Sequence, residues 1–189
     1  DTLREGARAL GIDLSDEQAG KLVTHLDLLD DWNQHMNLTA IRDRGQQLTK
    51  HLLDSLSVRP YLRGGRIADV GSGAGFPGIP LAIVMPEVHF ALIESTGKKC
   101  RFLEHVRDTL ALTNLEVVQS RAEAFKPAAR FETVLARAVG PVADLVRNAG
   151  PLVTGGGRLL AMKGRFPEDE LAKKLSGWKV AAVHRLVVP

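Results

Sequence analysis

The fold of this chain is decided by the stretch Asp69-Val70-Gly71-Ser72-Gly73-Ala74-Gly75-Phe76-Pro77-Gly78. Residues 66–70 have the apolar pattern of a short strand, and the residues from Ile79 onward have that of a helix. A glycine-rich turn in this context is typical of α/β proteins that bind adenosine-containing cofactors, because glycines allow a tight turn and a close approach of ligand to backbone. Gly73 to Gly78 also satisfies the spacing G-x-G-x-x-G. That match alone is weak, so the neighbouring residues must identify the ligand.

Two acidic residues frame this glycine loop. Glu94 ends the second predicted strand, about 20 residues after the loop, where an acid suits a ribose diol. NAD and S-adenosylmethionine both carry that ribose. Asp69 separates them, because a carboxylate beside the loop repels a pyrophosphate but suits the ammonium group of a methionine moiety. The pattern therefore favours S-adenosylmethionine, with Gly71, Gly73 and Gly75 against the cofactor. The alternative for Asp69 is a turn or helix-capping acid.

The chain after residue 63 alternates between strand and helix. Apolar runs predict strands at residues 66–70, 89–93, 115–118, 131–136, 157–162 and 179–188. Amphipathic runs predict helices from residue 79 and at residues 98–112, 141–150 and 167–175. Strands that alternate with helices form βαβ units. We therefore expect an α/β, Rossmann-like fold, doubly wound around a mostly parallel sheet.

Residues 1–63 predict an N-terminal helical extension, or cap. Ser15 is placed to cap a helix, and Gln18 to complete its capping box. Leucines at helical spacing follow this start, and they recur in a later stretch that Pro60 ends. The interpretation divides the chain into the extension, 1–63, and a cofactor-binding domain, 64–189.

The composition excludes several classes of protein. Of the 189 residues, 44% are hydrophobic and 25% charged, as in ordinary globular domains. The single cysteine, Cys100, rules out an internal disulfide, so a reducing, cytoplasmic location is expected. No apolar run reaches the roughly 18 residues of a membrane span, no Cys/His cluster has zinc spacing, and no G-x-x-x-x-G-K-[ST] motif is present. We expect no membrane association, no metal and a monomer.

Three basic residues follow predicted strands. Arg121 follows the third strand, Arg137 the fourth and Lys163 the fifth. Ligands of an open α/β sheet bind beyond the carboxyl ends of its strands, so these cations are candidates for holding RNA phosphates or orienting a base. Each could equally be an ordinary surface cation. The net charge of +3 leaves that choice open.

A longer series of motifs occurs in order along the chain. It comprises Trp32-Asn33, Met36-Asn37-Leu38-Thr39, His51-Leu52-Leu53-Asp54-Ser55, residues 69–80, Glu94-Ser95, Lys98-Lys99, Gln119-Ser120-Arg121-Ala122-Glu123, Arg137-Ala138 and Lys163-Gly164. With these motifs the sequence resembles the bacterial glucose-inhibited division protein B family, the small-subunit ribosomal RNA guanine-N7 methyltransferases. The resemblance covers nearly the whole chain.

This resemblance implies a class I methyltransferase fold with a seven-stranded sheet, and methylation of N7 of one guanosine in 16S ribosomal RNA of the small subunit. It implies that Gly71 and Phe76 contact S-adenosylmethionine, with Ala122 and Glu123 around the adenine and Arg137 also at the cofactor site. Glu94 matches the ribose-binding acid, and Arg121 and Lys163 match basic positions at the mouth of the site. Family members continue past Pro189 into another strand, so the last strand is expected to be absent here.

No catalytic base is assigned from the sequence. Guanine N7 carries a lone pair and no proton, so catalysis is expected to come from positioning and from fixed charges. Three alternatives stay open: a methyltransferase acting on a protein or small molecule, an NAD-dependent oxidoreductase, and a non-catalytic RNA-binding module.

Overall fold

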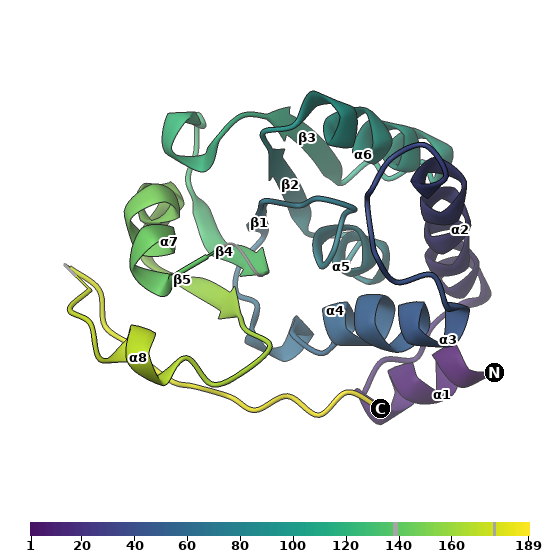
Figure 1. Cartoon of the computed structure of the whole chain (residues 1–189), viewed down its shortest axis with the longest axis horizontal. Coiled ribbons are helices and arrows are strands. Elements are labelled where there is room, and N and C mark those ends of the chain that lie inside the picture. The colour runs from purple at the N-terminus through teal and green to yellow at the C-terminus, as the bar shows by residue number, and fades with distance from the viewer. Residues whose placement is uncertain (138–139, 176) are drawn as a thin grey trace.

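The structure, a computed structural model, describes residues 1–137, 140–175 and 177–189. Its centre is a parallel sheet whose strands lie in the order β3-β2-β1-β4-β5 (Figure 1). The strands are β1 Arg66–Val70, β2 His89–Glu94, β3 Leu115–Gln119, β4 Phe131–Arg137 and β5 Val153–Met162. The chain builds outward from β1 to β3, then returns to β4 beside β1. Ligands of such sheets bind at this reversal, beyond the carboxyl ends of β1 and β4.

Helices alternate with these strands as the sequence predicts. They are α5 Gly78–Val84, α6 Gly97–Thr109, η3 Ala122–Ala124, α7 Val142–Ala149, η4 Gly150–Leu152 and α8 Glu168–Leu171. Successive strand residues point to opposite faces of a sheet, and the core divides accordingly. Ile67, Phe90 and Leu92 pack under α5 and α6, whereas Val70 and Ile93 belong to the cluster beneath α7.

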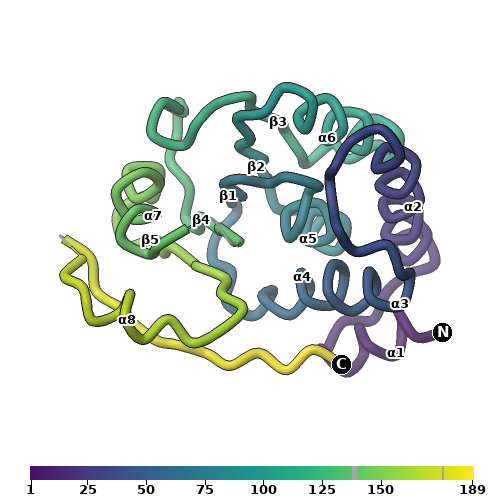
Figure 2. Tube along the Cα trace, viewed as in Figure 1, coloured from purple at the N-terminus to yellow at the C-terminus, as the bar shows by residue number. Residues whose placement is uncertain are grey.

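The N-terminal extension is helical, as predicted. It consists of α1 Thr2–Ala9, α2 Asp16–Asn33, α3 Arg44–Gln47, the π-helix η1 Leu48–Leu53, α4 Asp54–Leu56 and the 3-10 turn η2 Arg59–Tyr61. Ser15 caps α2, and Gln18 completes the capping box. In Figure 2 the extension wraps around α5 on the side away from α7. Its buried leucines, such as Leu22 and Leu56, share one hydrophobic cluster with the sheet.

Two expectations about the sheet are wrong. Five strands form in the described residues instead of seven, and the segment 179–188 carries no helix or strand. A strand requires a hydrogen-bonded neighbour, and the tail finds apolar surface instead of the edge of β5. It runs past η2 and α4 to end near α1 (Figure 1). There the ring of His184 lies 4.5 Å from that of Tyr61, and Leu186 and Val188 pack against the core.

The helix predicted at residues 167–175 is also shorter than expected, since α8 ends at Leu171. Among the described residues, no helix combines the length and the apolar character that crossing a bilayer requires.

Candidate functional site

The glycine loop between β1 and α5 is compact because its glycines leave no room for side chains. Gly75 has φ +95°, and a Cβ there would collide with the side chain of Ile79. A Cβ on Gly78 would collide with Leu92 and would lie 2.8 Å from Oδ2 of Asp69. The loop therefore packs directly on the helix that follows and on β2.

Two acidic side chains hold this loop in place by accepting hydrogen bonds from its backbone N–H groups. Oδ2 of Asp69 accepts the Gly78 N–H at 3.0 Å, so the carboxyl group spans the loop. Oε1 of Glu94 accepts the Gly73 N–H at 3.0 Å, and Oε2 accepts the Thr96 N–H at 2.8 Å. A carboxylate has about four acceptor positions, so Glu94 keeps capacity for two further hydrogen bonds.

Burial governs the charge state of Asp69. The side chain is 1% exposed, and desolvation raises its pKa to about 8, against the opposing effects of the Gly78 N–H, Ser72 and Arg137. Oδ1 has no hydrogen-bond partner among the described residues. Asp69 therefore acts in this structure as a buried, largely neutral brace of the loop, and a nearby cation would favour its charged form.

A cavity of about 150 Å³ opens at the carboxyl ends of β1, β2 and β3. It is lined by Val70, Gly71, Ile93, Ser95, Ser120, Arg121, Ala122, Glu123, Leu145, Asn148 and Ala149. Cavities of that volume are known to accept one aromatic ring. Apolar Val70 and Leu145 supply a surface for a flat ring, and polar groups stand around the rim.

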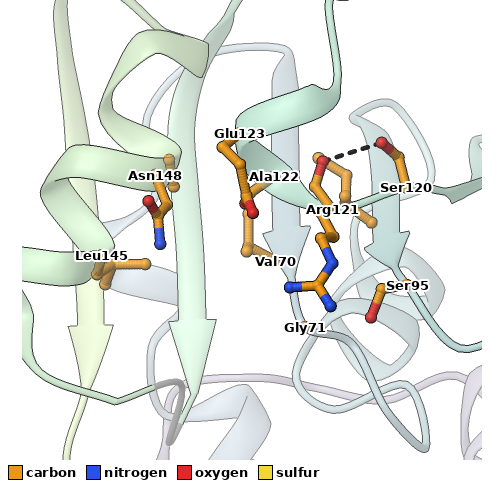
Figure 3. Close-up of a pocket in the computed structure, with 11 residues that line it drawn as sticks. Val70, Gly71, Ser95, Ser120, Arg121, Ala122, Glu123, Leu145 and Asn148 are labelled. Atoms are coloured by element: carbon orange, nitrogen blue, oxygen red, sulfur yellow. Dashed lines mark hydrogen bonds between the residues drawn. The ribbon is translucent and has the colours of Figure 1, made fainter.

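Figure 3 shows how the polar groups are arranged. Glu123 and Asn148 approach the cavity from η3 and α7, and the Arg121 side chain extends toward Gly71 and Ser95. The Ser120 hydroxyl donates to the Arg121 carbonyl oxygen at 2.9 Å, which fixes the start of this turn. Donors and acceptors therefore surround an apolar slot, as expected of a small-molecule site.

Phe76 lies away from this cavity. Its ring is 6% exposed and is stacked between His25 of α2, at 4.6 Å, and His51 of η1, at 4.5 Å. Nε2 of His25 lies 2.9 Å from the Ala74 carbonyl oxygen, and since a carbonyl only accepts, Nε2 carries the proton. Phe76, which was expected to contact the cofactor, therefore joins the glycine loop to the N-terminal extension.

Arg137, at the end of β4, also bonds to the extension. Its guanidinium donates to the Lys50 carbonyl oxygen at 2.7 Å and lies 3.5 Å from Oδ2 of Asp54. The same guanidinium acts on the pKa of Asp69, so its charge reaches the glycine loop. Arg137 therefore bridges α4, η1 and the point where the sheet reverses. Ala138, which follows it in the motif, lies outside the described residues.

Lys163 is engaged within the protein. Its ammonium group lies 3.0 Å from Oε2 of Glu170 and also bonds to the Gly140 carbonyl oxygen. Glu170 in turn accepts the Val142 N–H at 2.8 Å. These bonds tie the loop after β5 to the start of α7. Lys163 therefore serves first as a structural tie, in contrast to Arg121, whose side chain is exposed at the cavity.

The described ranges contain no group of three or more His, Cys, Asp or Glu side chains that could hold a metal ion.

The sequence profile of one protein family, described as rRNA small subunit methyltransferase G, matches residues 18–189. The chain belongs to this family. A relative named ribosomal RNA small subunit methyltransferase G from Nitrosococcus oceani is 46% identical over 187 residues, covering 99% of this chain and 87% of the relative. A relative of the same name from Stenotrophomonas maltophilia is 46% identical over 188 residues, with 100% and 88% covered.

Solved structures of other methyltransferases share the fold. Coclaurine N-methyltransferase bound to N-methylheliamine and SAH aligns with a TM-score of 0.54 at 15% identity, over 84% of this chain and 56% of that chain. Precorrin-6y C5,15-methyltransferase from Geobacter metallireducens aligns with a TM-score of 0.52 at 15% identity, over 70% and 68%. At such identities the likeness establishes the fold, and the predicted α/β, Rossmann-like architecture is confirmed.

The structure gathers only some of the predicted site residues around the cavity. Gly71, Arg121, Ala122 and Glu123 line it. The other predicted cofactor contacts do not line the cavity. They belong to the glycine loop or to the side chains that hold it in place, and they are Asp69, Gly73, Gly75, Phe76, Glu94 and Arg137.

The sequence did not reveal that α7 forms one wall of the cavity, through Leu145 and Asn148. Their spacing of three places both on one helix face, which is the only signal that the sequence offered.

Proposed function

We propose that this chain transfers the methyl group of S-adenosylmethionine to N7 of one guanosine in 16S ribosomal RNA of the small ribosomal subunit. Membership of the rRNA small subunit methyltransferase G family, over nearly the full chain, is the observation that carries the proposal. The cavity beyond the carboxyl ends of β1, β2 and β3 supports it, because ligands of open α/β sheets bind at the carboxyl ends of the strands.

The residues present fit S-adenosylmethionine. Gly75 and Gly78 let the loop pack directly on α5 and β2, and the buried Oδ1 of Asp69, next to the loop, has no hydrogen-bond partner among the described residues. Glu94 has free acceptor capacity for the ribose hydroxyls. The slot between Ala122 and Leu145 suits the adenine, with Glu123 and Asn148 at its edge. A pyrophosphate would instead place two negative charges beside Glu94 and beside the acceptor oxygens of Asp69.

S-adenosylmethionine supplies an electrophilic methyl group on sulfur. The chain's own residues then need only to hold the target guanine in line with that methyl group, because N7 attacks with its lone pair and no proton has to leave. No described residue is assigned as a general base. Arg121, exposed at the rim, and Arg137, at the end of β4, supply positive charge to position RNA.

We further propose that residues 1–63 act as a cap that folds together with the domain formed by residues 64–189. The extension holds the glycine loop through the contacts of Phe76 and the end of β4 through Arg137. Because both parts share one hydrophobic cluster, neither is expected to fold alone. A cytoplasmic monomer is part of the same proposal.

The test is transfer of labelled methyl from S-adenosylmethionine to small subunits from cells that lack this activity, followed by nucleoside analysis. Label in 7-methylguanosine at a single position of 16S ribosomal RNA is the expected result. Label in another nucleoside, or in protein, would overturn the proposal. Gly78→Ala, whose Cβ would displace the glycine loop from Leu92 and Asp69, is the control that abolishes transfer, and Gly20→Ala on the open face of α2 leaves it intact.

A further inference from the structure

A half-buried acidic side chain lies next to the end of β4 and has no role in the proposed methyl transfer. It belongs to Asp54, the first residue of α4, whose side chain is 30% exposed. Figure 1 shows α4 beneath the tip of β4. The Arg137 guanidinium links the two elements, since it lies 3.5 Å from Oδ2 of Asp54 and acts on the pKa of Asp69. Asp54 and the glycine loop therefore flank the same arginine.

The acceptor positions of Asp54 are largely unused. Among the described residues no hydrogen bond reaches its carboxyl oxygens, and the contact with Arg137 is an ion pair at the long end of the range. Arg137 instead directs its short bond to the Lys50 carbonyl oxygen, at 2.7 Å. Burial raises the pKa of Asp54, and Arg137 opposes that rise. The carboxyl group is partly exposed, so its vacant acceptors are accessible to a ligand that carries hydrogen-bond donors.

The backbone before Asp54 is unusual in the same place. Residues Leu48–Leu53 form a π-helix, a rare conformation that is frequently found at functional sites. His51 lies within it, and Lys50 presents to Arg137 the carbonyl that makes the short bond. The π-helix therefore positions both the Arg137 side chain and the start of α4.

Guanine matches this carboxyl group chemically. Its Watson–Crick edge presents N1–H and the N2 amino group side by side, and a carboxylate can accept both bonds at once. Adenine has an unprotonated N1 and no amino group at C2, so the same carboxylate would repel it. The edge that carries N7 lies on the other side of the base. A guanine whose Watson–Crick edge faces Asp54 can therefore turn N7 toward the cofactor.

We propose that Asp54 binds the Watson–Crick edge of the target guanine and is the residue that selects guanine over adenine. This inference rests on the proposed function. In the reaction the N7 lone pair forms the new N–CH₃ bond, the S–CH₃ bond breaks, and its electron pair stays on sulfur. The positive charge passes to the guanine ring, and no proton moves. A carboxylate bonded to N1–H and N2–H stabilises that charge as it develops.

The experiment uses small subunits reconstituted with guanosine or inosine at the target position. Inosine keeps N7 and N1–H but lacks the N2 amino group. The wild-type protein is expected to bind and methylate the guanosine substrate about tenfold or more better than the inosine substrate, the usual worth of a hydrogen bond to a charged group. In Asp54→Asn the overall rate falls and the preference for guanosine shrinks towards unity, in binding as well as in turnover.

Two further variants separate recognition from a structural role. Arg137→Gln removes the ion pair but leaves the carboxyl group, so the guanosine preference persists at reduced activity. Asp31→Asn, an exposed acid of α2, leaves both rate and preference unchanged. Full guanosine preference in Asp54→Asn, or no preference in the wild type, would overturn the inference. Failure of the wild type to methylate the guanosine subunits would instead overturn the proposed function.

Discussion

The imidazole of His51 lies flat against the ring of Phe76, with centroids 4.5 Å apart and an angle of 9° between planes. His25 covers the opposite face at 4.6 Å. Phe76 comes from the glycine loop, whereas both histidines come from the N-terminal extension. The conformation of the glycine loop is thus set in part by helices that precede the Rossmann-like domain. His25 also bonds to the loop backbone at Ala74, so the contact combines stacking with a hydrogen bond.

Replacing Phe76 with alanine should lower the free energy of unfolding by about 3–5 kcal/mol, because it empties a buried site between two rings. Affinity for S-adenosylmethionine should fall as well, since the loop loses its anchor. Urea unfolding and calorimetric titration measure the two effects. Phe166→Ala is the matched control, as that ring is 63% exposed and its loss should cost less than about 0.5 kcal/mol. Unchanged cofactor affinity in folded Phe76→Ala would contradict the anchoring role.

Acidification should destabilise the fold through His25 and His51. Burial, the first cause for each, lowers the pKa of both side chains to about 4 from the ordinary 6.5. The unfolded chain therefore takes up protons below pH 6.5 that the folded chain accepts only near pH 4. The stabilisation is complete above pH 6.5 and is lost as the pH falls to 4, by about 3 kcal/mol for the fully buried His25 and by less for His51.

The free energy of unfolding, measured between pH 7 and pH 4.5, checks this contribution. His25→Gln should show a smaller decrease than the wild type, because a glutamine retains a donor for the Ala74 carbonyl oxygen but does not titrate. The rise of the Asp69 pKa acts in both proteins alike and cancels in the difference. Equal decreases in the two proteins would show that His25 titrates normally.

Lys163 and Glu170 should behave as a coupled pair. Either Lys163→Ala or Glu170→Ala breaks the tie between the loop after β5 and the start of α7, so the double variant should lose little more than each single one. The pair is partly exposed, so solvent screens it and its coupling energy is expected to be small. Thermal unfolding of the four proteins gives that energy. Strict additivity would mean that the two side chains act independently.

Gly78→Ala should destabilise the protein and abolish cofactor binding. The added Cβ meets Leu92 and Asp69, and both are buried. Gly20→Ala is the opposite case, because nothing lies within 4 Å of its Cβ. That change in the α2 helix should stabilise the fold by about 0.5–1 kcal/mol. Unfolding curves and cofactor titration of the two variants test the contrast, and normal binding by Gly78→Ala would show that cofactor binding does not need the close packing of the loop on β2.

Arg121→Ala should weaken RNA binding and reduce its salt dependence. If the guanidinium contacts one phosphate, the slope of log K against log salt should become shallower by about 1. Filter binding of small subunits between low and moderate salt measures that slope. Lys163→Ala should change the slope less, since its ammonium group already contacts Glu170. An unchanged slope for Arg121→Ala would remove that residue from the RNA interface.

Strands β1 to β5 and the helices that separate them could be predicted, in their order, from the sequence. Alternating apolar runs predicted β1 to β5, because buried parallel strands and amphipathic helices carry local signatures of period and length. The glycine loop with Asp69 and Glu94 was equally readable, since turn geometry and an acid at a strand end depend on nearby residues. The capping box at Ser15 is local for the same reason.

The contacts of the side chains around the site could not be predicted from the sequence. The stacking of Phe76 between His25 and His51, and the bonds of Arg137 to Lys50 and Asp54, join segments far apart in the chain, and no sequence spacing predicts them. The tail at 179–188 failed as a strand for a related reason. An apolar pattern indicates that a segment can form a strand, but the strand forms only if it pairs with the edge of a sheet. Whether residues 179–188 pair with β5 or pack on the N-terminal extension depends on the whole fold.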